Sequence, residues 1–151
     1  PFRSNYWGST GPTSTTIQLN SGGGVNSSGS TYVVYCWAAV AGYSAFGKYT
    51  GNGSTDGPFV YCGFRPRWVM IKRSDSIGNW FTNDSSRNPS NVVTQDLYPN
   101  LSDAEGTNSG RLDILSNGFK IKDSNADRNT NTATYIYAAF AENPFKLSLA
   151  R

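Results

Sequence analysis

The sequence contains no histidine, only two cysteines and a single methionine. Without histidine the chain cannot build a Ser-His-Asp or Cys-His catalytic arrangement, and it lacks the commonest protein ligand of transition metals. Two cysteines alone do not fill a tetrahedral zinc site. We therefore expect no cofactor, no metal site and no enzymatic activity.

Long apolar runs and clustered charges are also missing. No stretch approaches the ~18 apolar residues that mark a membrane-spanning helix, so we expect no membrane insertion. Charged residues make up 15% of the chain, with a formal net charge of +3. The basic residues are scattered, whereas nucleic-acid-binding surfaces show them clustered. We therefore expect no nucleic-acid partner.

The two cysteines, Cys36 and Cys62, each lie inside an apolar run. Such a pair does not make the dense disulfide framework of a small secreted module. We favour two buried thiols that behave as small apolar residues. A single disulfide remains open, because the two runs could lie side by side.

Short runs rich in β-branched and aromatic residues recur along the chain, and polar, Gly-rich or Pro-rich segments separate them. The run Thr31–Val40 is apolar at both sets of alternating positions, which predicts a central strand covered on both sides. A helical turn at Ser102–Glu105 is the one departure from strand and loop that we expect. Further strands are predicted at Phe59–Phe64, Trp68–Arg73, Asn79–Thr82 and Thr134–Ala141.

This pattern predicts an all-β fold, namely one antiparallel β-sandwich or jelly-roll-like domain with long polar loops. Residues 1–30 are predicted to form an irregular N-terminal segment packed on the domain, and residues 31–151 to form the sandwich. Since Pro1 is not an initiator methionine, we expect the chain to be a fragment, a processed product or the tail end of a longer chain.

The segment "RLDILSNGFKIK", residues 111–122, predicts a β-hairpin. With Asn117–Gly118 as the turn, we expect type I′ geometry, because both turn residues then need a positive φ that Asn and Gly tolerate. The resulting register places Asp113 opposite Lys122. It also gathers four apolar side chains on one face, those of Leu112, Ile114, Phe119 and Ile121.

Two distant segments resemble each other. A shift of 103 residues lays "NSSGSTYVVYCWA" from Asn26 onto "NTNTATYIYAAFA" from Asn129. Two similar strands, each entered through a polar loop, would suit neighbouring central positions in one sheet. A match this short can also arise by chance.

The acidic residues are not spaced as carboxylate catalysis or calcium binding would require. Glycoside hydrolysis needs two carboxylates brought together, and nothing in the spacing of the acidic residues does so. The segment "DSNADR", Asp123–Arg128, begins like a calcium-binding loop, but Arg128 stands where that loop needs glycine. We interpret it as a solvated loop.

Aromatic residues in polar segments are the remaining candidate binding chemistry. An aromatic ring can stack on the apolar face of a sugar while neighbouring polar groups bond its hydroxyls. We nevertheless favour the interpretation that Trp80 packs inside the sandwich like Trp37 and Trp68, and Trp7 is a further candidate beside a polar segment. The residues named by the ligand-binding hypothesis are Trp80, Asp84, Arg87, Asn88 and Tyr98.

Several stretches in order along the chain carry a resemblance to a known family. The chain resembles a domain of unknown function found in tail-fibre-like and other structural proteins of bacteriophages, especially marine ones, often beside laminin-G or concanavalin-like domains. The matching stretches are "NYWGSTGPTST", "YVVYCWA", "FGKYTGNG", "GPFVYCGFRPRWVMIKR", "LDILSNGFK" and "TYIYAAFAENPFK".

The resemblance implies the C-terminal part of a longer virion protein at the particle surface, and it carries no catalytic or ligand residues over to this chain. We expect a non-enzymatic structural domain on a tail fibre or similar appendage that contributes to recognition of a host surface glycan. A homotrimer would explain strands that are apolar on both faces. The alternatives are a capsid or tail decoration or assembly domain that binds other virion proteins, and a carbohydrate-binding module of a secreted cellular protein.

Overall fold

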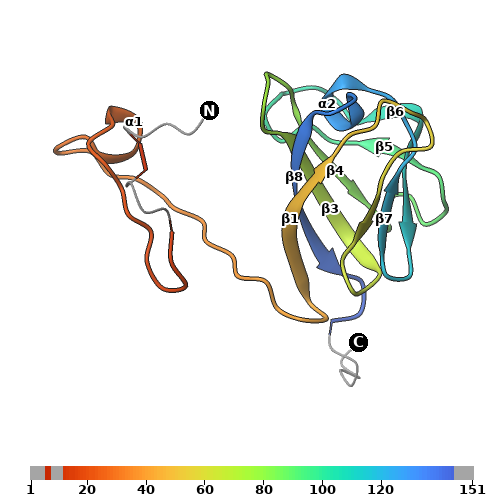
Figure 1. Cartoon of the computed structure of the whole chain (residues 1–151), viewed down its shortest axis with the longest axis horizontal. Helices are drawn as coiled ribbons and strands as arrows, with labels where there is room; N and C mark the ends of the chain where they lie inside the picture. Colours follow the sequence, from red (N-terminus) through yellow and green to blue (C-terminus); the bar gives the residue numbers. More distant parts are fainter. Residues whose placement is uncertain (1–5, 8–11, 145–151) are drawn as a thin grey trace. The chain divides into compact units, whose positions relative to one another are not determined.

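The computed structural model describes residues 6–7 and 12–144, and strands dominate its larger part (Figure 1). The chain divides into two units, Pro1–Trp37 and Ala38–Arg151. Among the described residues, no helix is both long enough and apolar enough to cross a membrane.

The second unit contains two four-stranded sheets, and all their strand pairs are antiparallel. The predicted all-β sandwich is confirmed. The first sheet has the order β1 (Ser44–Thr50), β8 (Thr134–Ala141), β3 (Pro66–Arg73) and β4 (Trp80–Asp84). The second sheet has the order β2 (Phe59–Tyr61), β7 (Gly118–Ile121), β6 (Gly106–Leu115) and β5 (Val93–Asp96).

The core is built by residues from both sheets. The rings of Tyr49 and Tyr135 stack with their centroids 5.1 Å apart. Both hydroxyls donate hydrogen bonds of 2.7 Å, that of Tyr49 to the carbonyl of Arg128 and that of Tyr135 to the carbonyl of Ala126. The aliphatic and aromatic residues buried with them are Val60, Val69, Ile71, Val93, Leu112, Ile114, Phe119 and Ile121.

Most predicted strands are present, with shifted ends. Strand β8 has the predicted bounds, and β3 begins at Pro66, a strand start where the missing amide donor is tolerated. Strand β2 is shorter than predicted and β4 begins and ends later. The sequence reading missed β1 and β5, whose residues are more polar. The predicted helical turn at Ser102–Glu105 is wrong, because that segment has no helical backbone.

The predicted hairpin forms, but its register differs by two residues. Asp113 lies opposite Lys120, and the carboxylate of Asp113 contacts Lys122 only diagonally, at 3.9 Å. The turn residues are Ser116 and Asn117, and neither has a positive φ. The predicted type I′ turn is therefore wrong.

Gly118 is required by the neighbouring strand and not by the turn. It belongs to β7, where an added Cβ would lie 2.1 Å from the carbonyl oxygen of Val60 in β2. Because a shift of two residues leaves the faces of a strand unchanged, the predicted apolar face is confirmed. Leu112, Ile114, Phe119 and Ile121 are all buried.

The predicted central strand Thr31–Val40 is wrong. Within the described residues, positions 31–39 belong to no strand, and Val40 makes only an isolated bridge to Ser44. The chain reverses through a turn at residues 41–43, where Gly42 has a φ of 75°. The apolar pattern indicated a segment able to form a strand, but it did not identify neighbouring strands to pair with.

The first unit contains the short helix α1 (Gly23–Asn26) and a bridge between Trp7 and Leu19. The hydroxyl of Tyr32 donates a hydrogen bond of 2.9 Å to the carbonyl of Gly23. Within this unit lies a cavity of about 310 Å³ with a largely apolar lining. Trp7, one of the candidate aromatic residues, lines this cavity together with Tyr32 and Tyr35.

Candidate functional site

The first sheet has one face toward the core and another that points away from the second sheet, which we call the outer face. Successive side chains of a strand alternate between faces. Val69 and Ile71 of β3 point into the core, so Trp68 and Met70 lie on the outer face. The register then adds residues from the other strands of this sheet. They include Phe46, Trp80, Ile136, Ala138 and Phe140.

The aromatic side chains of the outer face contact one another. The Phe140 ring lies with its centroid 5.7 Å from that of Trp68 and 5.8 Å from that of Phe46. Charged residues occupy opposite ends of the face, since Lys48 and Lys72 align with Trp80 at one end, whereas Asp84 aligns with Trp68 at the other. An apolar centre with a polar rim is typical of a protein interface.

Two of the residues proposed as ligand-binding lie on this face. Trp80 and Asp84 project from the first and last positions of β4, on the side opposite the core residue Phe81. The interpretation that Trp80 packs inside the sandwich is therefore wrong, and it is wrong for Trp68 as well. Trp37 lies in the first unit with an exposed side chain.

Asp84 and Arg87 are brought together and shape the loop after β4. The Oδ1 atom of Asp84 accepts hydrogen bonds from the backbone amides of Ser86, at 3.0 Å, and Arg87, at 2.8 Å. The Arg87 guanidinium binds the second oxygen of Asp84 and also Glu105, the latter at 2.6 Å. Partial burial tends to raise the pKa of Asp84, but the hydrogen bonds and charge of Arg87 outweigh it and hold the pKa below its ordinary value.

Asn88 and Tyr98 are engaged within the chain. The side-chain oxygen of Asn88 accepts hydrogen bonds from the amide and hydroxyl of Thr94. The Tyr98 ring packs 4.9 Å from that of Phe81, which projects to the opposite side of β4 from Trp80. The structure therefore does not place Tyr98 and Trp80 on one face.

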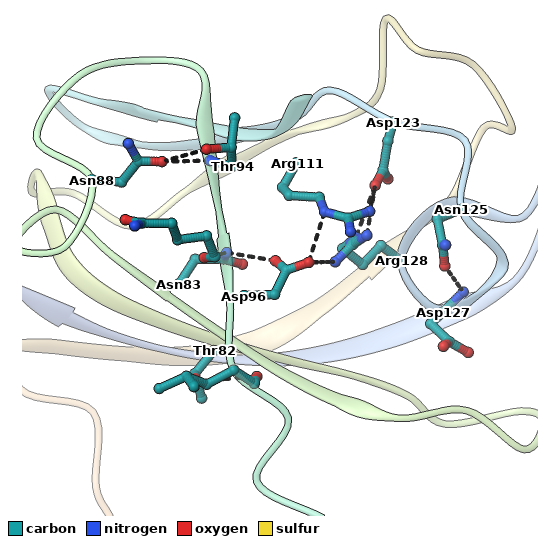
Figure 2. A network of polar contacts seen from close by, with 12 residues as sticks. Thr82, Asn83, Asn88, Thr94, Asp96, Arg111, Asp123, Asn125, Asp127 and Arg128 are labelled. Atoms are coloured by element: carbon teal, nitrogen blue, oxygen red, sulfur yellow. Dashed lines mark hydrogen bonds and ion pairs between the residues drawn. The ribbon is translucent and has the colours of Figure 1, made fainter. Parts of the chain in front are cut away.

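A network of buried charges lies at one end of the sandwich (Figure 2). The Arg128 side chain is 0% exposed, and its guanidinium lies 3.3 Å from Asp96 and 2.7 Å from Asp123. Arg111 contacts the same two carboxylates, at 2.7 Å and 3.4 Å. The Arg128 guanidinium also lies 4.1 Å from the centre of the Phe81 ring.

This network links separate parts of the fold through buried ion pairs. Its two arginines and two aspartates balance in charge, and they join β5, β6 and helix α2 (Ala126–Asn129). Removing one partner would leave an uncompensated buried charge, which is strongly destabilising. The interpretation of "DSNADR" as a solvated loop is wrong at its end, because Arg128 and Asn129 are buried. One partner of Arg128, Asp123, lies in the same segment, but Asp96 in β5 is far away along the chain, so the segment alone did not indicate that the arginine is buried.

The described residues hold no group of three His, Cys, Asp or Glu side chains that could bind a metal ion. Both cysteines are free thiols, with Cys36 exposed and Cys62 partly buried. The prediction of two buried thiols is therefore wrong for Cys36. Burial raises the pKa of the Cys62 thiol to about 11.

Residues 2–144 match the model of a family described as "Domain of unknown function (DUF7483)". The chain belongs to this family. Neither a curated protein nor a solved structure matches the sequence. The family match extends across the boundary between the two units, so a DUF7483 domain includes the segment that precedes the sandwich.

The second sheet of this DUF7483 domain presents two exposed aromatic residues that were not among the candidate ligand-binding residues. Phe59 and Tyr61 of β2 are exposed, and Val60 between them is buried. The alternation itself was a signal, because a strand with one wet face exposes every second residue. The signal was partly obscured because the two exposed positions are aromatic and the buried one, Val60, is aliphatic, so all three have apolar side chains.

Proposed function

We propose that this DUF7483 domain is a non-enzymatic structural domain of a bacteriophage virion, carried at the particle surface on a tail fibre or similar appendage. There it associates with copies of itself as a homotrimer and contributes to recognition of a host surface glycan. The observation that carries the association is the outer face of the first sheet. The phage setting rests on the family resemblance of the sequence.

The outer face supports association because its side chains do not serve the core. Trp68, Met70 and Phe140 remain partly exposed, and Ile136 is exposed. Burying such apolar surface stabilises a complex by roughly 25 cal/mol per Å² before the costs of association are counted. Clustered exposed apolar side chains mark interaction surfaces in soluble proteins.

The same face favours a second candidate function. A capsid or tail decoration domain would place the outer face against a different virion protein and would not need a sugar ligand. The two functions differ in where the domain lies on the particle and in whether the isolated domain forms trimers.

The oligomeric state tests self-association directly. In light scattering we expect a trimer for the wild-type domain and a monomer for Trp68→Lys, whose ammonium group would have to be buried at the interface. Tyr61→Lys is the matched control, because it places the same charge on the opposite sheet, and it should remain trimeric. A folded monomeric wild type would contradict self-association and favour a different virion protein as the partner.

Gold labelling of intact particles with an antibody against the domain tests its place in the virion. Label at the tips of tail appendages is the expected result. Label over the head or along the tail shaft would reject the appendage and favour the decoration or assembly role. A gene outside any cluster of virion genes would favour the carbohydrate-binding module of a secreted cellular protein.

A further inference from the structure

Strand β2, at the edge of the second sheet, carries two aromatic rings on one face. Phe59 is 45% exposed and Tyr61 is 67% exposed, whereas Val60 between them is 5% exposed. Residues two apart in a strand project to the same side, and their Cα atoms lie about 7 Å apart. The two rings therefore form a short aromatic strip on the side of the sheet that faces away from the core.

Both rings lie against glycine backbone. A Cβ added at Gly118, the cross-strand neighbour of Tyr61, would lie 3.1 Å from the Cζ atom of Phe59. A Cβ added at Gly63 would lie 3.6 Å from the Tyr61 hydroxyl oxygen and 3.8 Å from two carbons of its ring. Because no side chains stand at these positions, the rings rest along bare backbone and leave the rest of their surface to solvent.

Hydrogen-bonding groups border the aromatic strip. Lys120 lies directly opposite Phe59, and its ammonium group contacts Asp56 at 2.7 Å. The Asp56 side chain is 80% exposed, so its carboxylate keeps room for further partners. Next along the sheet, Asp113 lies opposite Lys120 and contacts Lys122 at 3.9 Å. Two positive and two negative groups thus balance, and the border carries donors and acceptors without net charge.

We propose that Phe59 and Tyr61 form a stacking platform for a neutral oligosaccharide built of hexose rings, with Asp56 and Lys120 bonding its hydroxyls. A pyranose ring has an apolar face of C–H groups and a rim of hydroxyls, which matches flat exposed rings bordered by donors and acceptors. The balanced border favours a neutral sugar over an acidic one. The inference rests on the proposed glycan recognition, for which it names a site and a ligand class.

The comparison with Trp80 supports the choice of site. The polar neighbour of Trp80 on the outer face, Asp84, already binds Ser86 and Arg87 through both carboxylate oxygens. Asp56 pairs with Lys120, but its side chain remains exposed to solvent. A sugar at the aromatic strip therefore finds a free acceptor, whereas a sugar at Trp80 competes with the chain's own hydrogen bonds.

Calorimetric titration with a panel of soluble hexasaccharides tests the platform. The panel contains β-1,4-glucose, β-1,4-N-acetylglucosamine, β-1,4-mannose and α-1,4-glucose oligomers, together with neutral polysaccharide from the host envelope and an oligogalacturonate as the acidic probe. We expect a neutral sugar to bind and Tyr61→Ala or Phe59→Ala to weaken binding about tenfold or more. Tyr61→Phe keeps the ring and should stay within about threefold.

Two controls separate the platform from folding and from the proposed function. Tyr61 is mostly exposed, so thermal melting of Tyr61→Ala should match that of the wild type. Ile77→Ala, in the loop that precedes β4 and outside the aromatic strip, should leave affinity unchanged, and Trp80→Ala tests the rival site on the outer face. Loss of binding in Trp80→Ala but not in Tyr61→Ala would overturn the platform while glycan recognition stands. Binding of the acidic probe alone, or of no saccharide, would also overturn it, and particle labelling would still decide the virion role independently.

Discussion

Two segments of this chain have similar sequences and different structures. "YVVYCWA" at residues 32–38 and "YIYAAFA" at residues 135–141 align without a gap. The second lies in β8, paired with β1 on one side and β3 on the other, and its Tyr135 is fully buried. The first belongs to no strand, and most of its apolar side chains are exposed, with Tyr35 76% exposed.

The difference shows that neighbours, more than composition, decide which apolar segment becomes a central strand. Strand β8 receives hydrogen-bonding partners along its whole length on both edges. Segment 31–39 precedes the turn at Gly42, and the pairing between the two arms of that turn goes no further than Val40 and Ser44. β-Propensity measures how well a side chain fits a pleated, half-buried surface, and only β8 has that surface.

The largest difference in stability is expected between alanine variants of the two aligned tyrosines, Tyr32 and Tyr135. Tyr135→Ala should lower the free energy of unfolding of the sandwich by about 3–5 kcal/mol, because it empties a core site. It also removes the hydroxyl bonded to Ala126 and Thr130. Tyr32→Ala should cost the sandwich less than about 1 kcal/mol, since Tyr32 belongs to the first unit and lies outside the core of the sandwich. Urea denaturation followed by circular dichroism measures both, and equal losses would contradict the contrast.

The two cysteines extend the comparison to reactivity. Cys36 lies in the exposed segment, aligned with the buried Ala139 of β8, and Cys62 follows β2 in the sandwich. With its pKa raised to about 11, only about one Cys62 thiol in a thousand is a thiolate at pH 8. We expect iodoacetamide to alkylate Cys36 about a hundredfold faster or more.

Variants with one cysteine each, Cys36→Ser and Cys62→Ser, give the two rates separately. Unfolding in urea should bring the rates together, because it removes the burial that protects Cys62. Similar rates in the native protein would show that the exposed segment 31–39 is covered in solution.

A smaller effect is expected at the edge of the first sheet, where a polar loop supports β4 in place of a neighbouring strand. Asp84→Asn keeps the shape of the side chain but loses its charge toward Arg87, and should cost about 1–2 kcal/mol at pH 7. The pKa of Asp84 in the folded state lies below its ordinary value, so its charged form stabilises the fold above that ordinary pKa. This contribution is lost as the pH falls through the lower, folded-state pKa.

Wild-type and Asp84→Asn unfolding curves between pH 2 and pH 7 measure this dependence. The gap in stability should be constant above about pH 5 and should close as the pH falls below about 4. A gap that persists unchanged to the lowest pH would show that Asp84 acts through its shape and not through its charge.

Local patterns in the sequence predicted the parts of the fold that depend on neighbouring residues in the chain. The alternation that buries Leu112, Ile114, Phe119 and Ile121 is a local property, and it survived a register error of two residues. Gly118 misled the turn prediction because its requirement comes from the Val60 carbonyl in another strand. Glycine in a sequence does not reveal whether φ or close approach requires it.

The candidate site was predictable only in part for the same reason. That β3 and β8 are apolar on both faces was visible in sequence, and the structure does place apolar side chains of both strands on the outer face. Asp84 and Arg87 are close in sequence, and they pair. Arg128, in contrast, meets Asp96 through the fold, and a charge in a polar run gives no local sign that it is buried. Tyr98 was grouped with Trp80, but its ring packs against Phe81, which projects to the opposite side of β4 from Trp80.

The smallest effect is expected from removing the whole first unit, Pro1–Trp37, which contains most of the exposed segment. The fragment 38–151 keeps all eight strands and every residue of the core, so its free energy of unfolding should change by less than about 1 kcal/mol. Hydrogen exchange should protect the amides of β8 equally in the fragment and in the whole chain. A fragment that fails to fold, or a β8 that exchanges much faster, would mean that the first unit stabilises the sandwich in solution. In that case the aligned segments would differ less in role than their exposure indicates, and homotrimer formation by the fragment would have to be measured before the outer face alone is held responsible for it.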